Sequence, residues 1–548
     1  MDNDGMEKRA LIAAVLCLLV LFLYQSFFVK SKKRPPQQPA PVEQVEREEI
    51  KEEIKEAPLP PERPIQIPSP EGKAEDVTVE TNLFTATFTT AGGRLKDWKL
   101  MPYREEVDPN SAPVNLVSNS DDHLLPLNLD FLGPTSRIIC NADKKSLILD
   151  RYGEEGKLSF SCTIPEFLRI KKEFVFFANQ YQAELFVTVE NLSESPLKGR
   201  LSLEWIGQKD QEKKGRSYGY VGPVAMIGEK VETKKLNKNN GLPDNVRWAG
   251  YEDKYFVAAL IPRNSPDMGL KVNKLIEEKE RVVESITMIH PQAMITPQRS
   301  LEQSYSMYFG PKDRKLLESL GVGLGKAIDF GWFNSIAKPL ITVLNVFYSF
   351  TKNYGLAIII LTVLIKILFY PLTQKSFQSM KEMQKLQPKM MELREKYKDD
   401  KEKLNREMMQ LYRTEKINPL GGCLPMILQI PVFIALYQGL WNAIELRHTP
   451  FIWWIDDLSA PEDIFSIPLF GFNLPFRILP LIMGVTMYLQ QKMTPTPTMG
   501  SSQQAKMMEW MPIIFTFLFW GFPSGLVLYW LVNNVLTIMQ QYFIRKKG

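Results

Sequence analysis

The sequence predicts an α-helical polytopic membrane protein that also carries a large all-β domain and a cytoplasmic helical hairpin. Three observations predict this class. Apolar segments long enough to cross a bilayer, which takes ~20 residues, occur near the start of the 548-residue chain and crowd its last third. Residues 73–310 form short alternating segments broken by Gly, Pro and Asn clusters, which is typical of antiparallel strands. The strongly charged segment 376–416 interrupts the apolar last third.

The first element is the apolar run Ala10 to Val29, which follows Lys8 and Arg9 as the core of a secretory signal does. It is longer than such a core and lacks a small-x-small cleavage site. We therefore expect residues 1–29 to form an uncleaved signal anchor and the first transmembrane helix. Residues 30–72 hold ten prolines among alternating Glu and Lys, a composition that cannot bury enough apolar surface to fold, and they are predicted to form a disordered tether.

The β-domain, residues 73–310, is predicted to be a mostly antiparallel sandwich from segments such as VTVETNLFTATFTT and YQAELFVTVEN. Its only histidines are His123 and His290, and it shows no metal-ligand spacing, phosphate-binding loop or nucleophile motif. We therefore expect a folded binding or spacer module with no catalytic residue, metal or cofactor. Cys140 and Cys162 could pair outside the cytoplasm, although free or simply buried thiols fit the sequence about as well.

Residues 311–353 are predicted to be a linker that ends in an amphipathic helix. Between Gly331 and Asn353, polar side chains such as Lys338 and Asn345 recur at helical spacing opposite apolar ones such as Leu340 and Leu344. Such a helix favours the membrane interface. The alternative is a helix that packs on the soluble domain.

The core, residues 354–548, contains five further candidate spans, which with the anchor make six. They lie at about 354–373, 419–443, 475–490, 507–522 and 524–544. The third and fourth of these five offer only 12 to 13 apolar-rich residues each, or ~20 Å of helix against a hydrocarbon core of ~30 Å. Such a mismatch thins the bilayer nearby.

Charge predicts the orientation of the spans. Residues 376–416 carry eleven Lys and Arg, whereas the loop from Glu445 to Asn473 is acidic and has Arg447 as its only arginine or lysine. The positive-inside rule then places the hairpin and both termini in the cytoplasm and the β-domain outside. The basic cluster from Lys30 to Arg34 disagrees locally, and we give more weight to the later loops.

The cytoplasmic segment 376–416 is predicted to fold as a short coiled-coil hairpin. Apolar residues from Met383 to Tyr397, and again from Leu404 to Leu411, alternate steps of three and four. Met391 and Met409 fall off this seam, which favours contact with another molecule. The excess of basic residues suits anionic phospholipids or ribosomal RNA, although a solvated face explains it as well.

Lys366 stands near the middle of an otherwise apolar run, where a charge costs at least ~2.5 kcal/mol. Thr362, Lys366, Tyr370 and Thr373 lie at spacings of four, four and three and so share one helix face, and the predicted spans hold no interior Asp or Glu. An ammonium without a carboxylate needs water, so we expect a hydrated cavity. Snorkelling is the alternative, but the inner surface near Lys375 is ~13 Å away.

Four segments together resemble the YidC family of membrane protein insertases: KINPLGGCLPMILQIPVFIALYQGLW, FPSGLVLYWLVNNVLTIMQQ, FIWWIDDLSAP and LIKILFYPLT. The resemblance covers essentially the whole chain. It implies a β-supersandwich in the periplasm and five core helices around a hydrophilic groove open to the cytoplasm. It also implies a Gram-negative inner-membrane insertase and chaperone for nascent membrane proteins, working alone or with the SecYEG translocon. The ribosome, the signal recognition particle pathway and anionic phospholipids are the other implied partners.

The resemblance also implies where the groove lies. The expected groove residues are Lys366, Thr362, Tyr370, Gln429, Tyr529, Trp530 and Asn533. The family usually has arginine where this chain has Lys366, which keeps the charge but loses the planar fork that binds a carboxylate bidentately. Trp530 stands where the family often has the second of two tyrosines.

Two other functions fit parts of the sequence. A small-solute transporter would also use a membrane lysine, but it should show paired charges or matched broken helices in two halves, and we find no internal repeat. A membrane-tethered sugar-binding or sugar-active protein is favoured only by the predicted sandwich.

Overall fold

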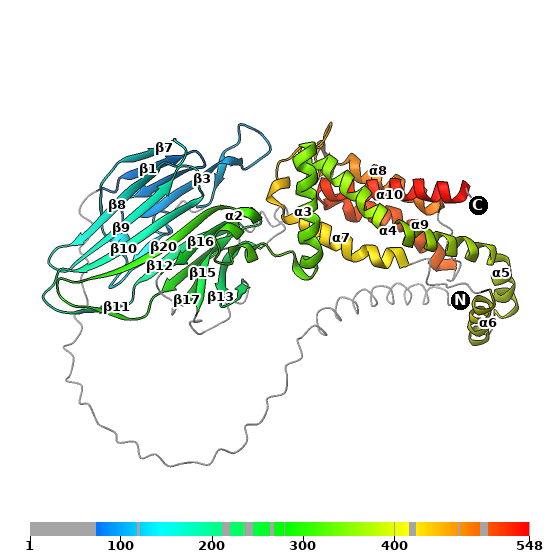
Figure 1. Ribbon diagram of the computed structural model, residues 1–548, viewed down its shortest axis with the longest axis horizontal. Helices are drawn as coiled ribbons and strands as arrows, with labels where there is room; N and C mark the ends of the chain where they lie inside the picture. The colour runs from blue at the N-terminus through cyan, green and yellow to red at the C-terminus, as the bar shows by residue number, and fades with distance from the viewer. Residues whose placement is uncertain are drawn as a thin grey trace, which may run out of the picture. The chain divides into compact units, whose positions relative to one another are not determined.

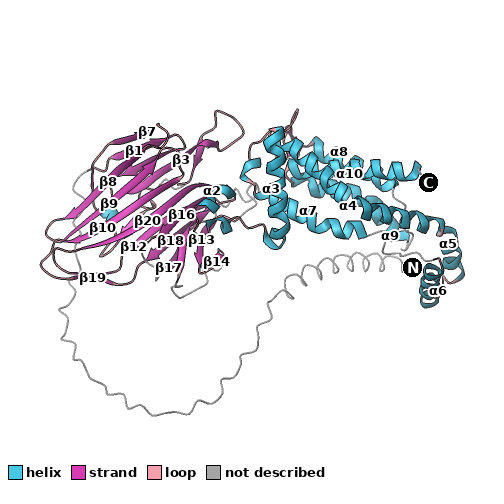
Figure 2. Cartoon of the chain, in the orientation of Figure 1, coloured by secondary structure: helices cyan, strands magenta, loops and turns pink. Residues whose placement is uncertain are grey.

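The computed structural model describes residues 73–546, apart from 118–120, 211–219, 234–235, 237–244, 264–267, 279, 399, 416–423, 470–471 and 494–501. These residues form a large β-domain and a helical core (Figures 1 and 2). The predicted anchor, 1–29, and tether, 30–72, lie outside the described residues, as do positions 416–423 of the NPLGGCLP segment.

Four sheets make up the β-domain. The largest has nine strands in the order β14 (Lys230–Glu232), β13 (Gly222–Ile227), β15 (Val246–Glu252), β16 (Phe256–Pro262), β20 (Ser300–Pro311), β10 (Gln182–Asn191), β9 (Leu168–Phe177), β8 (Glu155–Ile164) and β6 (Asn141–Ala142). A second follows the order β4 (Pro113–Asn115), β3 (Arg94–Arg104), β2 (Phe84–Thr89), β1 (Asp76–Thr81) and β7 (Ser146–Leu149). A third follows the order β17 (Gly269–Glu277), β18 (Arg281–Ile289), β12 (Ser202–Asp210) and β5 (Asn128–Asp130), and β11 (Leu197–Gly199) pairs with β19 (Ala293–Ile295). Among the described strands of the domain only β1 and β7 pair in parallel.

Alternating side chains explain why these segments form strands. In β10 every second side chain is buried, because successive residues of a strand face opposite sides of the sheet. The smaller sheets pack on the nine-stranded one through aromatic contacts: Phe88 lies 4.9 Å from Phe174, and Trp205 lies 4.7 Å from Phe309, between ring centroids. The predicted large β-domain, mostly antiparallel, is therefore confirmed.

Lys172 of β9 is fully buried and holds the turn between β2 and β3 in place. Its ammonium donates hydrogen bonds to the carbonyls of Gly92, Gly93 and Leu127 at 2.8, 3.3 and 2.7 Å. Gly92 and Gly93 both have positive φ, and a Cβ on Gly92 would lie 2.8 Å from the Thr135 carbonyl oxygen. Burial, helped by the charge of Arg94, lowers the pKa of Lys172 to about 7.

Cys140 and Cys162 form a disulfide, which decides between the alternatives that the sequence left open. The bond closes a loop with a sequence separation of 22 residues, and both cysteines lie in the apolar core of the domain. We expect the Cys140→Ser, Cys162→Ser double variant to lower the free energy of unfolding of the β-domain by about 3 kcal/mol, because its unfolded chain regains loop entropy. Urea unfolding of the two proteins under oxidising conditions measures this difference, and equal midpoints would contradict it.

The helices are α2 (Arg314–Ser319), α3 (Asn334–Thr351), α4 (Tyr354–Lys385), α5 (Gln387–Lys396), α6 (Lys401–Thr414), α7 (Leu424–Asn442), α8 (Ile478–Met493), α9 (Ser502–Leu518) and α10 (Ser524–Lys546). Strands β21 (Phe465–Leu469) and β22 (Phe472–Phe476) form a hairpin before α8. Short 3-10 turns occupy Thr135–Arg137, Leu324–Ala327, Gly331–Phe333, Ile444–Leu446 and Phe519–Gly521. Within the described part of the chain, α4 alone is both long and apolar enough to cross a membrane.

Helix α4 extends further than the predicted span. It begins where the Asn353 side chain accepts a hydrogen bond from the Leu356 N–H at 3.1 Å, and it passes through Pro371 to end at Lys385. The predicted hairpin therefore begins as a continuation of α4, and a break at Leu386 separates α4 from α5. Pro388 stands in the first turn of α5, where its missing N–H costs nothing.

One apolar cluster holds the core helices together. It includes Leu361 of α4, Leu440 of α7, Met483 of α8 and Leu526 of α10. Helix α3 packs on α4 and α7, with Ile341 and Leu344 among the buried residues of the same cluster. Its Phe350 is 81% exposed, which suits a helix with one face toward lipid.

Candidate functional site

Lys366 of α4 donates hydrogen bonds to two side chains of α10. Its Nζ lies 3.0 Å from Asn533 Oδ1 and 2.7 Å from Thr537 Oγ1. The two acceptors are one helical turn apart and only 8% and 6% exposed, whereas Lys366 is half-buried. Both acceptors are neutral, and Lys366 takes part in no ion pair among the described residues. The dipoles of Asn533 and Thr537 therefore contact this charge in place of a carboxylate.

A row of buried polar side chains continues from Lys366 between α4 and α10. Gln540 donates to the Thr373 hydroxyl at 3.0 Å, and Thr537 donates to the Asn533 carbonyl at 2.6 Å. We define the polar seam as Lys366, Thr373, Ser376, Asn533, Thr537 and Gln540; apart from Lys366, none is more than 8% exposed. From Lys366 to Ser376 it follows α4 for ~15 Å toward the hairpin.

Thr362 and Tyr370 are placed differently from Lys366. The Thr362 hydroxyl donates to the carbonyl of Ile358 in its own helix at 2.6 Å, and the side chain is 1% exposed. Tyr370 is 48% exposed, so it does not belong to the buried seam. The reason is that a spacing of four residues drifts about 40° around a helix with 3.6 residues per turn, so Thr362 and Tyr370 lie about 40° to opposite sides of Lys366.

Tyr529, Trp530 and Gln429 lie beside one another but not at Lys366. Tyr529 is 1% exposed and its side chain approaches Gln429 of α7. Trp530 packs among aromatic rings, with Phe433 at 4.8 Å and Phe519 at 5.1 Å between centroids. Of the expected groove residues on α10, Asn533 is the one that contacts Lys366.

Thr537 was missed by the sequence reasoning. It is not ionisable, and within the segment FPSGLVLYWLVNNVLTIMQQ its only signal is its position four residues after Asn533, which places both on the α4-facing side of α10. Such spacing arguments require the partner helix to be known first.

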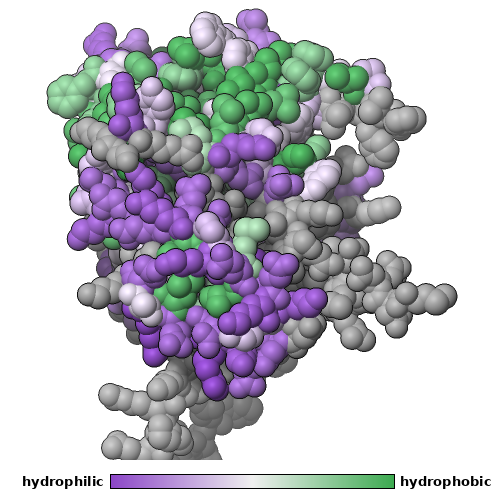
Figure 3. All heavy atoms as spheres, turned by 90° about the vertical axis from the view of Figure 1, so that its right-hand side faces the viewer, coloured by the Kyte–Doolittle hydropathy of each residue, from purple (hydrophilic) through white to green (hydrophobic). Residues whose placement is uncertain are grey.

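The hairpin carries exposed methionines on a charged surface. Met391 and Met409 are 64% and 55% exposed, while Met390 is buried against Leu386 and Tyr412. Lys389 pairs with Glu415 at 2.7 Å across the hairpin. In Figure 3 hydrophilic side chains gather over the hairpin in the lower half of the view, below a hydrophobic region over the core helices.

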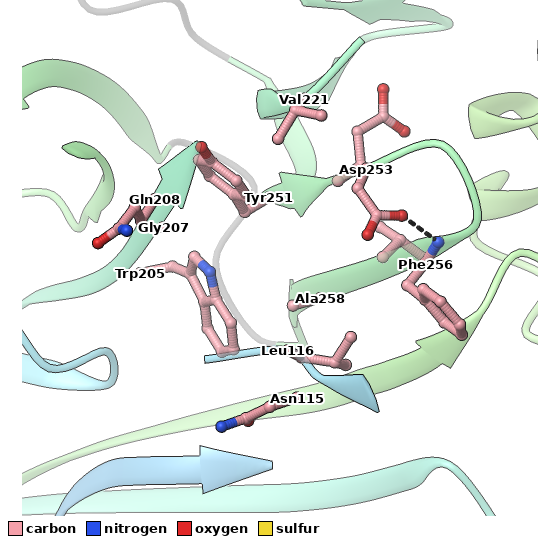
Figure 4. A pocket seen from close by; sticks show the side chains of 12 residues that line it. Asn115, Leu116, Trp205, Gly207, Gln208, Val221, Tyr251, Asp253, Phe256 and Ala258 are labelled. Carbon is pink, nitrogen blue, oxygen red and sulfur yellow. Dashed lines mark hydrogen bonds between the residues drawn. The ribbon is translucent and has the colours of Figure 1, made fainter. Parts of the chain in front are cut away.

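The β-domain contains a cavity of about 80 Å³ between β12, β15 and β16 (Figure 4). Its two carboxylates are already engaged: Glu252 pairs with Lys312 at 2.5 Å, and Asp253 accepts from the N–H groups of Tyr255 and Phe256 at 2.7 and 2.6 Å. No group of three or more metal-ligating side chains occurs among the residues that the structure describes. The cavity does not present a free acid–base pair.

The chain matches two protein families and many named relatives. The family model described as "60Kd inner membrane protein" matches residues 346–548, and the "YidC periplasmic domain" model matches residues 76–343. "Membrane protein insertase YidC" of Syntrophus aciditrophicus is 44% identical over 99% of this chain and 100% of its own length, and that of Geotalea uraniireducens is 42% identical over 99% of both. A crystal structure of an active YidC insertase with its first transmembrane domain resolved aligns over 85% of this chain and 92% of its own, at 18% identity and a TM-score of 0.38, too low to carry a structural argument.

Proposed function

This chain belongs to the YidC family of membrane protein insertases, and on that premise we propose that its polar seam receives the polar segment of a client during insertion. The protein is an inner-membrane insertase with a periplasmic domain, and it is not an enzyme. We propose that Lys366 and its neighbours on α4 and α10 contact the client during insertion.

The proposed topology has six spans. The hairpin α5–α6 and both termini lie in the cytoplasm, and the β-domain lies in the periplasm. The eleven basic residues of segment 376–416 and the acidic loop after α7 support this orientation. In it, the polar seam runs from the middle of the bilayer at Lys366 toward the cytoplasmic end of α4.

We propose that the seam lines a hydrated groove that opens to the cytoplasm. The supporting observation is the pairing of Lys366 with Asn533 and Thr537, two neutral groups that leave its positive charge uncompensated. A client segment with acidic residues supplies the missing opposite charge, and neutral partners cost less to displace than a carboxylate would. The groove therefore favours short acidic segments on their way to the periplasm.

The client leaves the groove sideways into lipid. Its apolar segment slides along the outer faces of the third and fifth spans, and burial of that segment contributes ~25 cal/mol per Å². The membrane potential adds a pull on acidic residues. Nascent chains arrive from the ribosome or the signal recognition particle pathway, or beside the SecYEG translocon, and anionic phospholipids bind the basic hairpin.

Photo-crosslinking from the groove tests this route. A crosslinking amino acid at position 366 or 537 should capture a stalled nascent chain that carries a short acidic leader. The same amino acid at position 368, whose leucine is 71% exposed on α4, should capture the apolar segment or lipid and not the leader. Capture of the leader at 368 alone would contradict the proposed groove.

We propose that Met391 and Met409 contact the ribosome or a targeting factor. The Met391→Ser, Met409→Ser double variant should reduce ribosome-coupled insertion by about threefold without changing the melting temperature, since exposed methionines contribute to binding more than to packing. Met294→Ser in the β-domain removes an equally exposed methionine and should have no effect. Normal ribosome-coupled insertion by the double variant would reject this role.

A further inference from the structure

The loop between α7 and α8 binds the first turns of α8 and α10. Its Ala460 and Leu458 carbonyls accept from the N–H groups of Ser524 and Gly525 at 2.9 and 3.0 Å. Its Glu462, 7% exposed, accepts a hydrogen bond from the N–H of Leu479 in the first turn of α8. Unpaired N–H groups at a helix start need such acceptors. We call residues 449–462 the end loop.

The end loop also binds the start of α4. The Asn353 side chain donates to the Phe451 carbonyl at 3.3 Å, and the Phe451 ring lies so close to Gly355 that a Cβ there would be 2.0 Å from it. The end loop therefore joins the same ends of α4, α8 and α10. Since α4 begins after the periplasmic domain, these are the ends that the proposed topology places at the outer face of the membrane.

Residues 451–455 form a closed turn within the end loop, which we call the tip. The backbones of Phe451 and Ile455 pair at 2.9 Å, and the Ile455 N–H closes a turn onto the Ile452 carbonyl at 3.2 Å. Trp454 is held by its indole N–H, which donates to Glu462 at 2.6 Å. Both sides of the tip are therefore attached to the helix ends, and its position follows that of the bundle.

Trp453 belongs to this tip. It is 83% exposed and has a φ of 54°, a left-handed conformation that is costly for a bulky side chain. The neighbouring Ile452 is 47% exposed, and the Trp454 ring lies 5.6 Å from that of Trp453. A highly exposed aromatic side chain with a costly backbone conformation, at the end of a membrane bundle, indicates a contact outside the chain.

We propose that Trp453 inserts into the boundary between headgroups and acyl chains of the outer leaflet, and that it sets the depth of the core in the bilayer. Tryptophan prefers this boundary because its ring is apolar while its N–H needs a polar partner. The occupant is phospholipid, because the tip continues directly from the ends of the spanning helices.

This depth determines where Lys366 lies. From Tyr354, at the outer end of α4, to Lys366 is twelve residues, or ~18 Å along the helix. Half of a ~30 Å hydrocarbon core is ~15 Å, so a tip at the outer boundary keeps Lys366 close to the bilayer midplane. A shallower bundle would move the ammonium toward the periplasm and shorten its distance from water on that side.

Depth-dependent fluorescence quenching tests the proposal with the full chain in nanodiscs. The emission difference between the wild type and Trp453→Asn isolates Trp453, and asparagine tolerates the left-handed backbone. Phospholipids brominated near the headgroup end of their acyl chains should quench this difference by about twofold, more than lipids brominated near the methyl end. Aqueous iodide should quench it least.

Quenching of Trp453 by iodide but not by brominated lipid would overturn the proposal, and so would the absence of quenching by either. Where Trp453→Asn lowers the melting temperature, 5-hydroxytryptophan at position 453 of the otherwise native chain gives the same measurement, since it is excited apart from the other tryptophans. Trp453→Gly should leave the melting temperature unchanged, because glycine adopts positive φ freely.

Discussion

Lys366→Met should reduce insertion of clients with acidic leaders by roughly tenfold while leaving the protein folded. Methionine keeps most of the length of the side chain and removes the charge that Asn533 and Thr537 leave uncompensated. At an effective dielectric constant of ~20, opposite charges ~8 Å apart attract by about 2 kcal/mol, which is enough for such a loss. Proteoliposomes that insert radiolabelled clients, with leaders differing only in their acidic residues, measure the effect.

Control variants distinguish the effect of the lost charge from a disruption of the protein structure. Lys366→Arg should retain most of the activity, since it keeps the charge, and Lys375→Ala removes an exposed lysine of the same helix and should have no effect. Clients with neutral leaders should insert equally well in all variants. Equal loss for acidic and neutral leaders in Lys366→Met would mean that the groove charge does not select clients.

Lys172→Met should lower the free energy of unfolding of the β-domain by about 3–5 kcal/mol, since it leaves three buried carbonyls without a donor and frees the turn at Gly92 and Gly93. Denaturant unfolding followed by tryptophan emission detects this. Lys171→Met, on the exposed face of the same strand, is the matched control and should stay within about 0.5 kcal/mol of the wild type. If only the Lys171→Met control lost free energy of unfolding, Lys172 would not hold the turn between β2 and β3 in place.

The same lysine makes stability depend on pH. Its pKa is lowered to about 7 in the folded protein from an ordinary value of 10.5, so between pH 7 and 9 the unfolded chain binds more protons than the folded one. The free energy of unfolding should therefore rise with pH in this window, by at most about 1.4 kcal/mol per pH unit from this group. In Lys172→Met this rise in the free energy of unfolding should be absent. Parallel pH profiles of the variant and the wild type would argue against a contribution from Lys172.

The sequence predicts the class of this chain well because its main signals are local. Alternation along β10 and the apolar run that contains Lys366 each arise from residues close in sequence. The membrane lysine could be recognised as exceptional without any knowledge of its neighbours, since a charge is rare in an apolar segment of any fold.

The partners of Lys366 could be predicted only in part. Asn533 was expected from the family resemblance, whereas Thr537 was not among the groove residues that the resemblance implies. Tyr370 was expected beside Lys366 on spacing alone, and its 48% exposure reflects the gradual drift of a four-residue repeat around the helix. Side chains that meet across helices depend on the rotation of each helix, which periodicity does not determine.

The end loop shows a second limit of prediction from the sequence. Glu462 was interpreted from sequence only as one of the charges that orient the loop, yet it is nearly buried and binds both Trp454 and the start of α8. When a carboxylate caps a helix that is distant in sequence, the residues around the carboxylate do not indicate this role. The break at Leu386 was likewise missed, because the apolar spacing continues across it while Pro388 starts a new helix.

The most direct test of the central claim is the accessibility of position 366 to water from the cytoplasm. Lys366→Cys, in a chain whose Cys17 and Cys423 are serine and whose Cys140–Cys162 disulfide is kept, should react with a membrane-impermeant thiol reagent in inside-out vesicles and not in right-side-out ones. Leu368→Cys, on the exposed face of the same helix, should react in neither. Labelling of position 366 from the periplasmic side, or from neither side, would contradict a groove that opens to the cytoplasm.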